Sequence, residues 1–192
     1  MTNNALRKLS IRARFAVALT CFRTKLRQEG LHQDPAIRLF LKQLAHFTQA
    51  QRLDSWEAEI LSLTNLKLNA EDTLKQIQHY NQIESTQLHK KSSNCLINQL
   101  TVQQYQSIKQ QLQLLPEQLN NLLALCIMVG RNNLYAGIVK FSIETLEPMQ
   151  KALELVPLPI HWEVLIQQYN FKDNDGWGKP FNYEHFVQVM KS

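Results

Sequence analysis

The chain has 192 residues, a formal net charge of +5 and a hydrophobic content of 44%. This length suits one domain or two small ones, and the apolar content excludes a disordered chain. It has only five glycines, and its Leu, Gln, Ala and Lys content favours helix over sheet. The three cysteines are odd in number and lack the spacing of a zinc site, which is typical of reduced thiols in the cytosol.

Positive charge is concentrated at the amino end. Residues 1–52 contain ten Lys and Arg against two acidic residues, Glu29 and Asp34. Residues 53–192 contain eleven against fourteen acidic residues. This asymmetry is typical of a protein that docks partners through a complementary electrostatic field, although a solvated helix surface would give the same pattern.

Residues 5–29 are predicted to form a long helix that ends at Gly30. Its apolar residues fall on two nearly opposite sides, which predicts a helix sandwiched between neighbours. The charges are left in narrow stripes, and one stripe consists of Arg7, Arg14 and Lys25. The apolar run 15–22 is too short for a membrane span and lacks a cleavage site after it. We therefore expect a cytoplasmic protein without a membrane span, with a mitochondrial presequence as the weaker alternative.

Two further helices have recognisable starts. Asp34 can cap a helix, and Pro35 suits its first position. Asp54 or Ser55 is predicted to cap a short helix that carries Trp56.

The middle of the chain is less regular. Residues 70–83 have a weak amphipathic pattern, and the polar stretch 85–94 is the candidate mobile loop or domain seam. Thr101 can cap a glutamine-rich helix, and Pro116 starts another. The continuous apolar run 122–129 predicts that this helix, closed by Gly130, is the central core helix.

Helical patterns continue toward the carboxyl end. Thr145 is predicted to cap a helix with Pro148 in its first turn, residues 160–169 form a short helix, and Asn182 caps the last one. No strand-like alternation is present. The fold class is therefore all-α, a single domain over residues 1–192 with about eight antiparallel helices, and a solenoid-like stack is the open alternative.

A glycine-rich loop precedes the last helix. Residues 173–176 read Asp-Asn-Asp-Gly, which invites comparison with a calcium-binding loop. In that register Phe171 and Asn182 stand where the two decisive carboxylates are needed, so we reject calcium and predict a turn. Trp177 lies between two glycines and is interpreted either as a core contact or as an interface anchor.

Signatures of other chemistry are missing from the sequence. The six histidines have no metal-ligand spacing, and no glycine-rich phosphate-binding loop occurs. We therefore expect no metal, no cofactor and no enzymatic activity. Nucleic-acid binding stays the alternative to protein binding, although no recognised binding motif accompanies the basic amino end.

Three stretches together resemble a known family. They are LSIRARFAVALTCF at 9–22, LDSWE at 53–57 and DGWGKPF at 175–181. This order is similar to that of small helical bacterial immunity proteins from contact-dependent growth inhibition and polymorphic toxin systems. The resemblance covers both ends of the chain and leaves the glutamine-rich middle uncovered.

The resemblance implies a non-enzymatic cytoplasmic inhibitor that binds a cognate toxin domain and blocks its active site or substrate surface. For a basic toxin, the expected contacts are Asp173, Asp175, Trp177 and Glu184. For an acidic toxin, the expected surface is the basic stripe of Arg7, Arg14 and Lys25. The alternative function is a helical nucleic-acid-binding or regulatory protein that uses the basic amino-terminal helix.

Overall fold

The computed structural model describes residues 6–64, 100–134 and 142–191. These ranges contain eight α-helices and no strand, which confirms the all-α prediction. The helices are α2 (Ile11–Gln28), α3 (Pro35–Ala45), α4 (Leu53–Thr64), α6 (Val102–Gln113), α7 (Glu117–Arg131), α8 (Ile143–Leu155), α9 (Trp162–Gln168) and α10 (Tyr183–Lys191). Short 3-10 helices are η1 (Leu31–Gln33), η2 (His46–Thr48) and η4 (Asp173–Gly176). The predicted helix at 70–83 and the seam at 85–94 lie outside the described residues.

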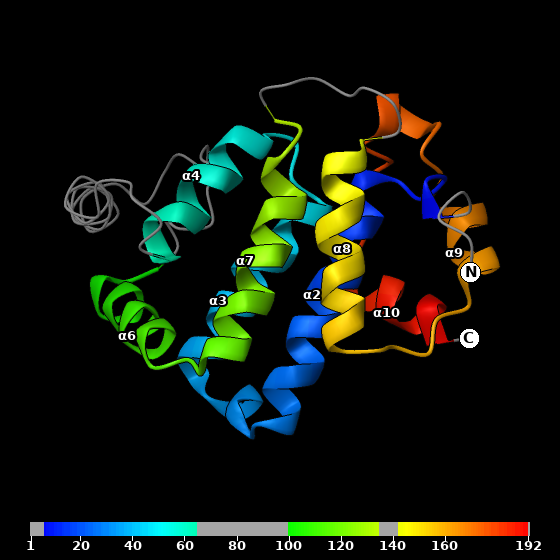
Figure 1. Cartoon of the computed structure of the whole chain (residues 1–192). Coiled ribbons are helices and arrows are strands. Elements are labelled where there is room, and N and C mark those ends of the chain that lie inside the picture. Colours follow the sequence, from blue (N-terminus) through cyan, green and yellow to red (C-terminus); the bar gives the residue numbers. More distant parts are fainter. Residues whose placement is uncertain (1–5, 65–99, 135–141, 192) are drawn as a thin grey trace.

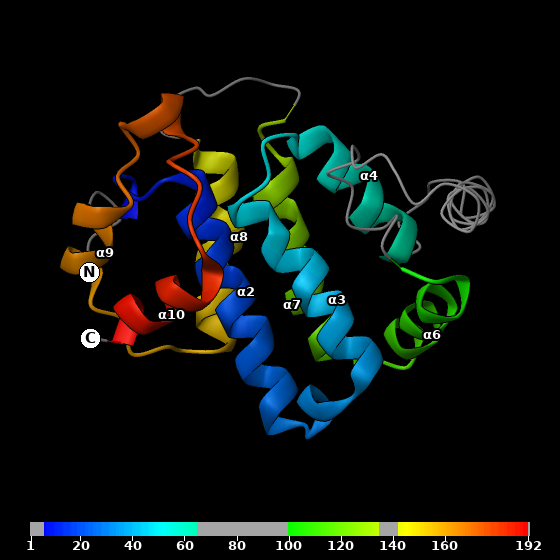
Figure 2. The ribbon, with the colours of Figure 1, turned by 180° about the vertical axis from the view of Figure 1, so that it is seen from behind.

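Helix α2 is the centre of the bundle. Figures 1 and 2 show it between α7 and α8 on one side and α3 and α10 on the other, and it contacts all four. Every residue from Ile11 to Phe22 is buried, as the two-sided apolar pattern predicted. Contacts between the first helix and helices late in the chain distinguish this bundle from a solenoid, in which each repeat touches its neighbours only.

Helix α7 packs on α2 and is not itself the central helix. Its Met128 is 45% exposed, so the expectation of burial on most sides was wrong there. Gly130 lies inside α7, where it was expected to close the helix. A Cβ at Gly130 would come within 2.6 Å of the Trp56 ring. This glycine therefore makes room for a fully buried tryptophan from α4.

The start of α2 differs from the prediction. Residues before Ser10 do not continue the helix, because they pair with a segment near the carboxyl end. Leu9 forms an isolated antiparallel bridge with Asn170, and Ser10 N–H donates to the Tyr169 carbonyl at 2.9 Å. The predicted start at residue 5 was wrong because this long-range pairing competes with the helix.

Other helix ends test the cap predictions. Asp34, Thr101 and Asn182 each accept hydrogen bonds from backbone N–H groups of the first turn that follows, as predicted. Gly30 follows α2 in the left-handed region at φ 75°. Thr145 is not a cap, because α8 begins after Ser142 and Thr145 lies within the first turn.

The start of α4 also departs from the cap prediction. Helix α4 begins at Leu53, so Asp54 and Ser55 lie inside it and neither caps it.

The helices also bear on the membrane question. Within the described ranges no single helix is long and apolar enough to cross a bilayer, and α6 with α7 would qualify only as a pair bent by 117°.

Candidate functional site

The loop at 173–178 is shaped by left-handed backbone. Asn174, Asp175, Gly176 and Gly178 have φ angles of 49°, 50°, 91° and 80°. Trp177 is half-buried, and its ring lies 6.5 Å from the Phe47 ring. The loop is therefore a structured turn, and Trp177 contacts the core.

Backbone and glycine contacts hold this loop on the start of α2. The Trp177 carbonyl accepts a hydrogen bond from Arg12 N–H at 3.2 Å. A Cβ at Gly178 would lie 2.5 Å from the Ser10 hydroxyl oxygen, so only glycine fits there. Beyond the loop, Phe181 is tied to Thr48, its N–H donating to the Thr48 carbonyl at 3.0 Å and its carbonyl accepting from the Thr48 hydroxyl at 2.9 Å.

The four residues expected to contact a basic toxin, Asp173, Asp175, Trp177 and Glu184, come from two separate elements. Asp173 is half-buried and Asp175 is exposed in η4 beside Trp177. Glu184 instead begins α10, and Figure 2 shows an extended segment that separates the loop from this helix. Asp173, Asp175 and Trp177 therefore lie in one loop, and Glu184 lies on a separate element.

The predicted basic stripe is not an exposed surface. Arg14 is fully buried, and its guanidinium donates to the Ser142 carbonyl and the Thr145 hydroxyl at 2.8 Å and to the Arg7 carbonyl at 2.9 Å. Lys25 pairs with Glu29 at 2.8 Å, and its side chain is 17% exposed. The prediction was wrong at Arg14 because α8 packs on this part of α2 and covers the side chain, which then donates to groups in the interior.

Arg12 is also a buried hydrogen-bond donor, and its acceptors lie in and after η2. Its guanidinium donates to the carbonyls of Phe47 and Ala50, the latter at 2.8 Å. Burial lowers the pKa of Arg12 to about 10 and that of Arg14 to about 9. Both guanidinium groups are therefore still charged at neutral pH, and they act as internal hydrogen-bond donors.

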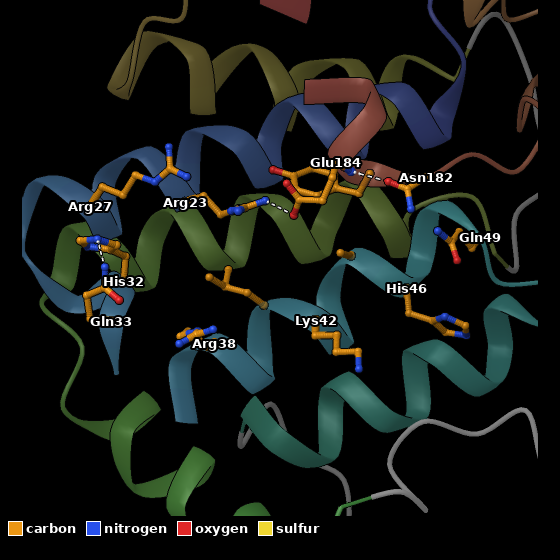
Figure 3. Close-up of a pocket in the computed structure, with 13 residues that line it drawn as sticks. Arg23, Arg27, His32, Gln33, Arg38, Lys42, His46, Gln49, Asn182 and Glu184 are labelled. Carbon is orange, nitrogen blue, oxygen red and sulfur yellow. Dashed lines mark hydrogen bonds and ion pairs between the residues drawn. The ribbon is translucent and has the colours of Figure 1, made fainter. Parts of the chain in front are cut away.

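Another set of cations lines an open groove, which we call the basic groove. It has a volume of about 690 Å³ and lies between the second half of α2, helix α3 with η1 and η2, and the start of α10 (Figure 3). Its lining residues are Arg23, Arg27, His32, Gln33, Arg38, Leu41, Lys42, Ala45, His46, Gln49, Asn182, Tyr183 and Glu184.

Helical spacing aligns the groove-lining side chains on the two walls. Arg38, Lys42 and His46 recur every four residues, so they share one face of α3 and its η2 extension. The opposite face of α3 is buried. Arg23 and Arg27 are also four residues apart and face the groove from α2 (Figure 3).

One wall carries an internal ion pair. Arg23 Nη1 lies 2.7 Å from Glu184 Oε1, and its guanidinium lies 5.1 Å from the centre of the Tyr183 ring. Burial alone would lower the pKa of Arg23, but the neighbouring Tyr183 and Glu184 raise it overall. Burial raises the pKa of Tyr183 to about 12, so this phenol is neutral at physiological pH.

The other permanent cations of the groove are uncompensated. Arg27, Arg38 and Lys42 are all exposed, and within the described ranges none of them forms an ion pair. Glu184 is the acidic side chain among the lining residues that the structure describes. The groove therefore carries a positive surplus that favours an anionic ligand.

A titratable side chain adjoins these cations. Burial and the nearby positive charge of Arg12 lower the pKa of His46 from its ordinary value of 6.5. His46 is therefore neutral at physiological pH. On the amino-terminal side of the groove, the His32 ring shares a 2.9 Å hydrogen bond with the Gln33 amide.

Metal-ligand groups and reactive thiols are two features of the described residues that bear on catalysis. No group of three His, Cys, Asp or Glu among them could hold a metal ion. Cys21 and Cys126 are buried, and burial raises the pKa of the Cys21 thiol to about 12, which disfavours a reactive thiolate. The uncompensated cations of the basic groove, by contrast, suit the binding of an anion.

Sequence reasoning missed the basic groove, although part of its signal was present. The four-residue spacing of the cations within each helix can be read from the sequence. The pairing of α2 with α3 and α10 across a groove cannot, because it depends on tertiary packing. Comparison of the chain with protein-family models, curated proteins and solved structures found no match.

Proposed function

We propose that this protein is an immunity protein that binds and neutralises a cognate toxin domain, with the basic groove as its contact face. The observation that supports a binding role most directly is the cluster of uncompensated cations at Arg27, Arg38 and Lys42. Such a face attracts an acidic patch on a partner and speeds productive encounter. A bound inhibitor of this size would cover the toxin's active site or substrate surface.

The three stretches behind the family resemblance meet in the interior. Phe15 lies 5.3 Å from Trp56 between ring centroids, and Phe47 contacts both Trp56 and Trp177. These stretches therefore describe a core. A resemblance carried by core residues concerns the scaffold, and the surface then remains free to differ between partners.

For an acidic toxin, the basic groove takes the place of the stripe of Arg7, Arg14 and Lys25 that was expected from the sequence. An acidic toxin surface fits the basic groove, whereas a basic toxin would require the loop with Asp173, Asp175 and Trp177. We favour the groove because its charges are exposed and uncompensated. The loop face is the alternative.

The second candidate is nucleic-acid binding, which the same positive charge favours. Proteins that bind single strands usually provide exposed aromatic rings for base stacking. The aromatic residue among the described groove residues is Tyr183, which is only 3% exposed. We therefore rank this function below protein binding.

The immunity function predicts a toxin-encoding open reading frame immediately upstream of the gene, and the test is co-expression with that toxin domain. We expect the wild-type chain to rescue growth and to co-elute with the toxin domain on gel filtration. The double variant Arg27→Glu/Arg38→Glu should lose both properties. The control Lys172→Glu makes a like change of charge at an exposed site outside the groove and should retain them.

Failure of the wild-type chain to rescue growth or form a complex would contradict the immunity function. Rescue by the double variant at wild-type level would place the contact face elsewhere, and Asp173→Asn/Asp175→Asn would then test the loop. Retention on immobilised DNA that falls steeply with salt would instead support the second candidate.

A further inference from the structure

The groove already holds one carboxylate. Glu184 Oε1 contacts Arg23 Nη1 at 2.7 Å, although the Glu184 side chain is 67% exposed and that of Arg23 only 23%. The start of α10 brings Glu184 there, since the Asn182 side chain accepts the Glu184 N–H at 2.9 Å. Figure 3 shows the pair on the groove wall formed by α2 and α10.

We propose that the basic groove binds an acidic helical segment of a partner protein, and that a carboxylate of this segment displaces Glu184 from Arg23. This inference deepens the proposed function and rests on it for the identity of the partner. Glu184 then acts as an internal competitor that occupies Arg23 in the free protein.

The spacing of the cations fits a helical ligand. The cations Arg38 and Lys42 are four residues apart, which is about 6 Å along a helix axis at 1.5 Å per residue, and the neutral His46 follows at the same interval. Acidic residues at every fourth position of a partner helix repeat the same interval. A partner helix along the groove would thus meet α3 on one side and Arg27 with Arg23 on the other.

The groove also has features that suit a polypeptide. Leu41 and Ala45 line it between the charged side chains, and Gln33, Gln49 and Asn182 add neutral amides. Amides and short apolar side chains complement a helix that is only partly charged. A bare phosphate chain would gain little from Leu41 and Ala45.

Displacement of Glu184 requires little rearrangement. Its side chain is mostly exposed, and exposed ion pairs are weak, so its carboxylate can return to water at small cost. Arg23 is less exposed and keeps a carboxylate partner throughout the exchange. A ligand that reaches only Arg27 and α3 does not compete with Glu184 and gains nothing from its release.

The probe is a fluorescently labelled helical peptide of about twelve residues with Glu at every fourth position, a length of about 18 Å. A second peptide has the same composition with the Glu positions scrambled, and a single-stranded DNA of similar charge is the third probe. Fluorescence anisotropy at low salt measures the affinity of the purified full chain for each.

We expect the spaced peptide to bind more tightly than both other probes. Glu184→Gln should tighten this binding about two- to fivefold, the range that loss of one exposed competing ion pair allows. Arg27→Glu/Arg38→Glu should weaken it by at least about tenfold. The control Lys172→Glu should stay within about twofold of wild type, and circular dichroism with thermal melts confirms that each variant folds.

Unchanged or weaker binding by Glu184→Gln, with the fold intact, would overturn displacement of Glu184. Equal affinity for the scrambled peptide would overturn the helical spacing, and tighter binding of DNA would overturn the choice of a protein segment. These results do not depend on the toxin. Peptide binding as expected without growth rescue would reject the immunity function alone, and rescue without peptide binding would reject this inference alone.

Discussion

Helix α2 carries arginines in both halves, and their surroundings differ completely. In the first half, Arg12 and Arg14 are buried and donate to backbone carbonyls of other segments. In the second half, Arg27 is exposed and Arg23 is half-buried, and both line the basic groove. The same residue type on one helix thus stabilises the fold at one end and provides the candidate binding site at the other.

The difference arises from what packs on each half. The carboxyl-terminal loop, η2 and the start of α8 cover the first half, and the carbonyls of Phe47, Ala50 and Ser142 in neighbouring segments accept hydrogen bonds from Arg12 and Arg14. The second half lies beside α3 and the start of α10, where the groove stays open to solvent. A basic stripe on a predicted helix therefore indicates an exposed basic surface only when the segments that pack on that helix are known.

The largest expected effect on stability is at Arg14. Arg14→Met keeps an unbranched side chain of similar length but removes the guanidinium hydrogen bonds to the Ser142 carbonyl, the Thr145 hydroxyl and the Arg7 carbonyl. We expect the free energy of unfolding to fall by about 3–4 kcal/mol, because each hydrogen bond made by a charged group contributes about 1.5–3 kcal/mol. Chemical denaturation measures the change.

Arg14→Lys sharpens this prediction. An ammonium cannot reproduce the fork of guanidinium donors, so its loss of stability should be intermediate. A wild-type denaturation midpoint for Arg14→Met would mean that the buried arginines do not hold the fold together.

The next largest effect is at Gly178, in the loop that covers the first half of α2. Gly178→Ala places a Cβ 2.5 Å from the Ser10 hydroxyl oxygen in a residue with φ 80°. We expect a loss of about 2–3 kcal/mol from overpacking and left-handed strain together. Gly30→Ala is the matched control, because Gly30 has φ 75° but no atom within 4 Å of the position that a Cβ would take.

The Gly30 control should show the backbone strain alone, about 1 kcal/mol. Equal losses at Gly30 and Gly178 would show that the close contact with Ser10 contributes nothing. Thermal or urea unfolding of both variants decides this point.

A smaller effect on stability is expected from His46, which lines the basic groove and is close enough to Arg12 for its positive charge to act on the imidazole. Its pKa is lowered in the folded chain, so the unfolded chain binds more protons once the pH falls toward 6.5. Stability should therefore decrease as the pH falls from about 7.5 to about 5.5, and His46→Gln should reduce this decrease. Melting temperatures across this range, with His161→Gln as the control, provide the measurement.

The smallest effect on stability is expected at Arg27, on the groove side. Arg27→Met removes an exposed charge and should change the free energy of unfolding by less than about 0.5 kcal/mol. Its binding of the spaced acidic peptide should nevertheless weaken. A stability loss as large as that of Arg14→Met would remove the distinction between the two halves of α2.

Local patterns in the sequence predicted most helices. Asp34 with Pro35, Thr101 and Asn182 start helices where their side chains can accept the first N–H groups, because capping depends on residues within one turn. The start of α2 and the role of Gly130 were missed. Both depend on distant residues, a bridge to Asn170 in one case and the Trp56 ring in the other.

The candidate site was less accessible to sequence reasoning than the fold. Trp177 was correctly recognised as a residue held in a tight loop, and the structure shows that it contacts Phe47. Arg14 was placed on a surface because helical periodicity gives the direction of a side chain but not what covers it. The groove residues were overlooked because they come from three separate segments.

The sequence by itself determined the all-α class, the two-sided burial of α2 and the caps at Asp34, Thr101 and Asn182, since these depend on spacing and on contacts within a turn. Only the tertiary structure decided which arginines became buried donors and which became a basic groove. The reason is physical. The desolvation and hydrogen bonding of a charged side chain depend on the segments packed around it. Here one of those segments, at Ser142, lies more than a hundred residues along the chain from Arg14.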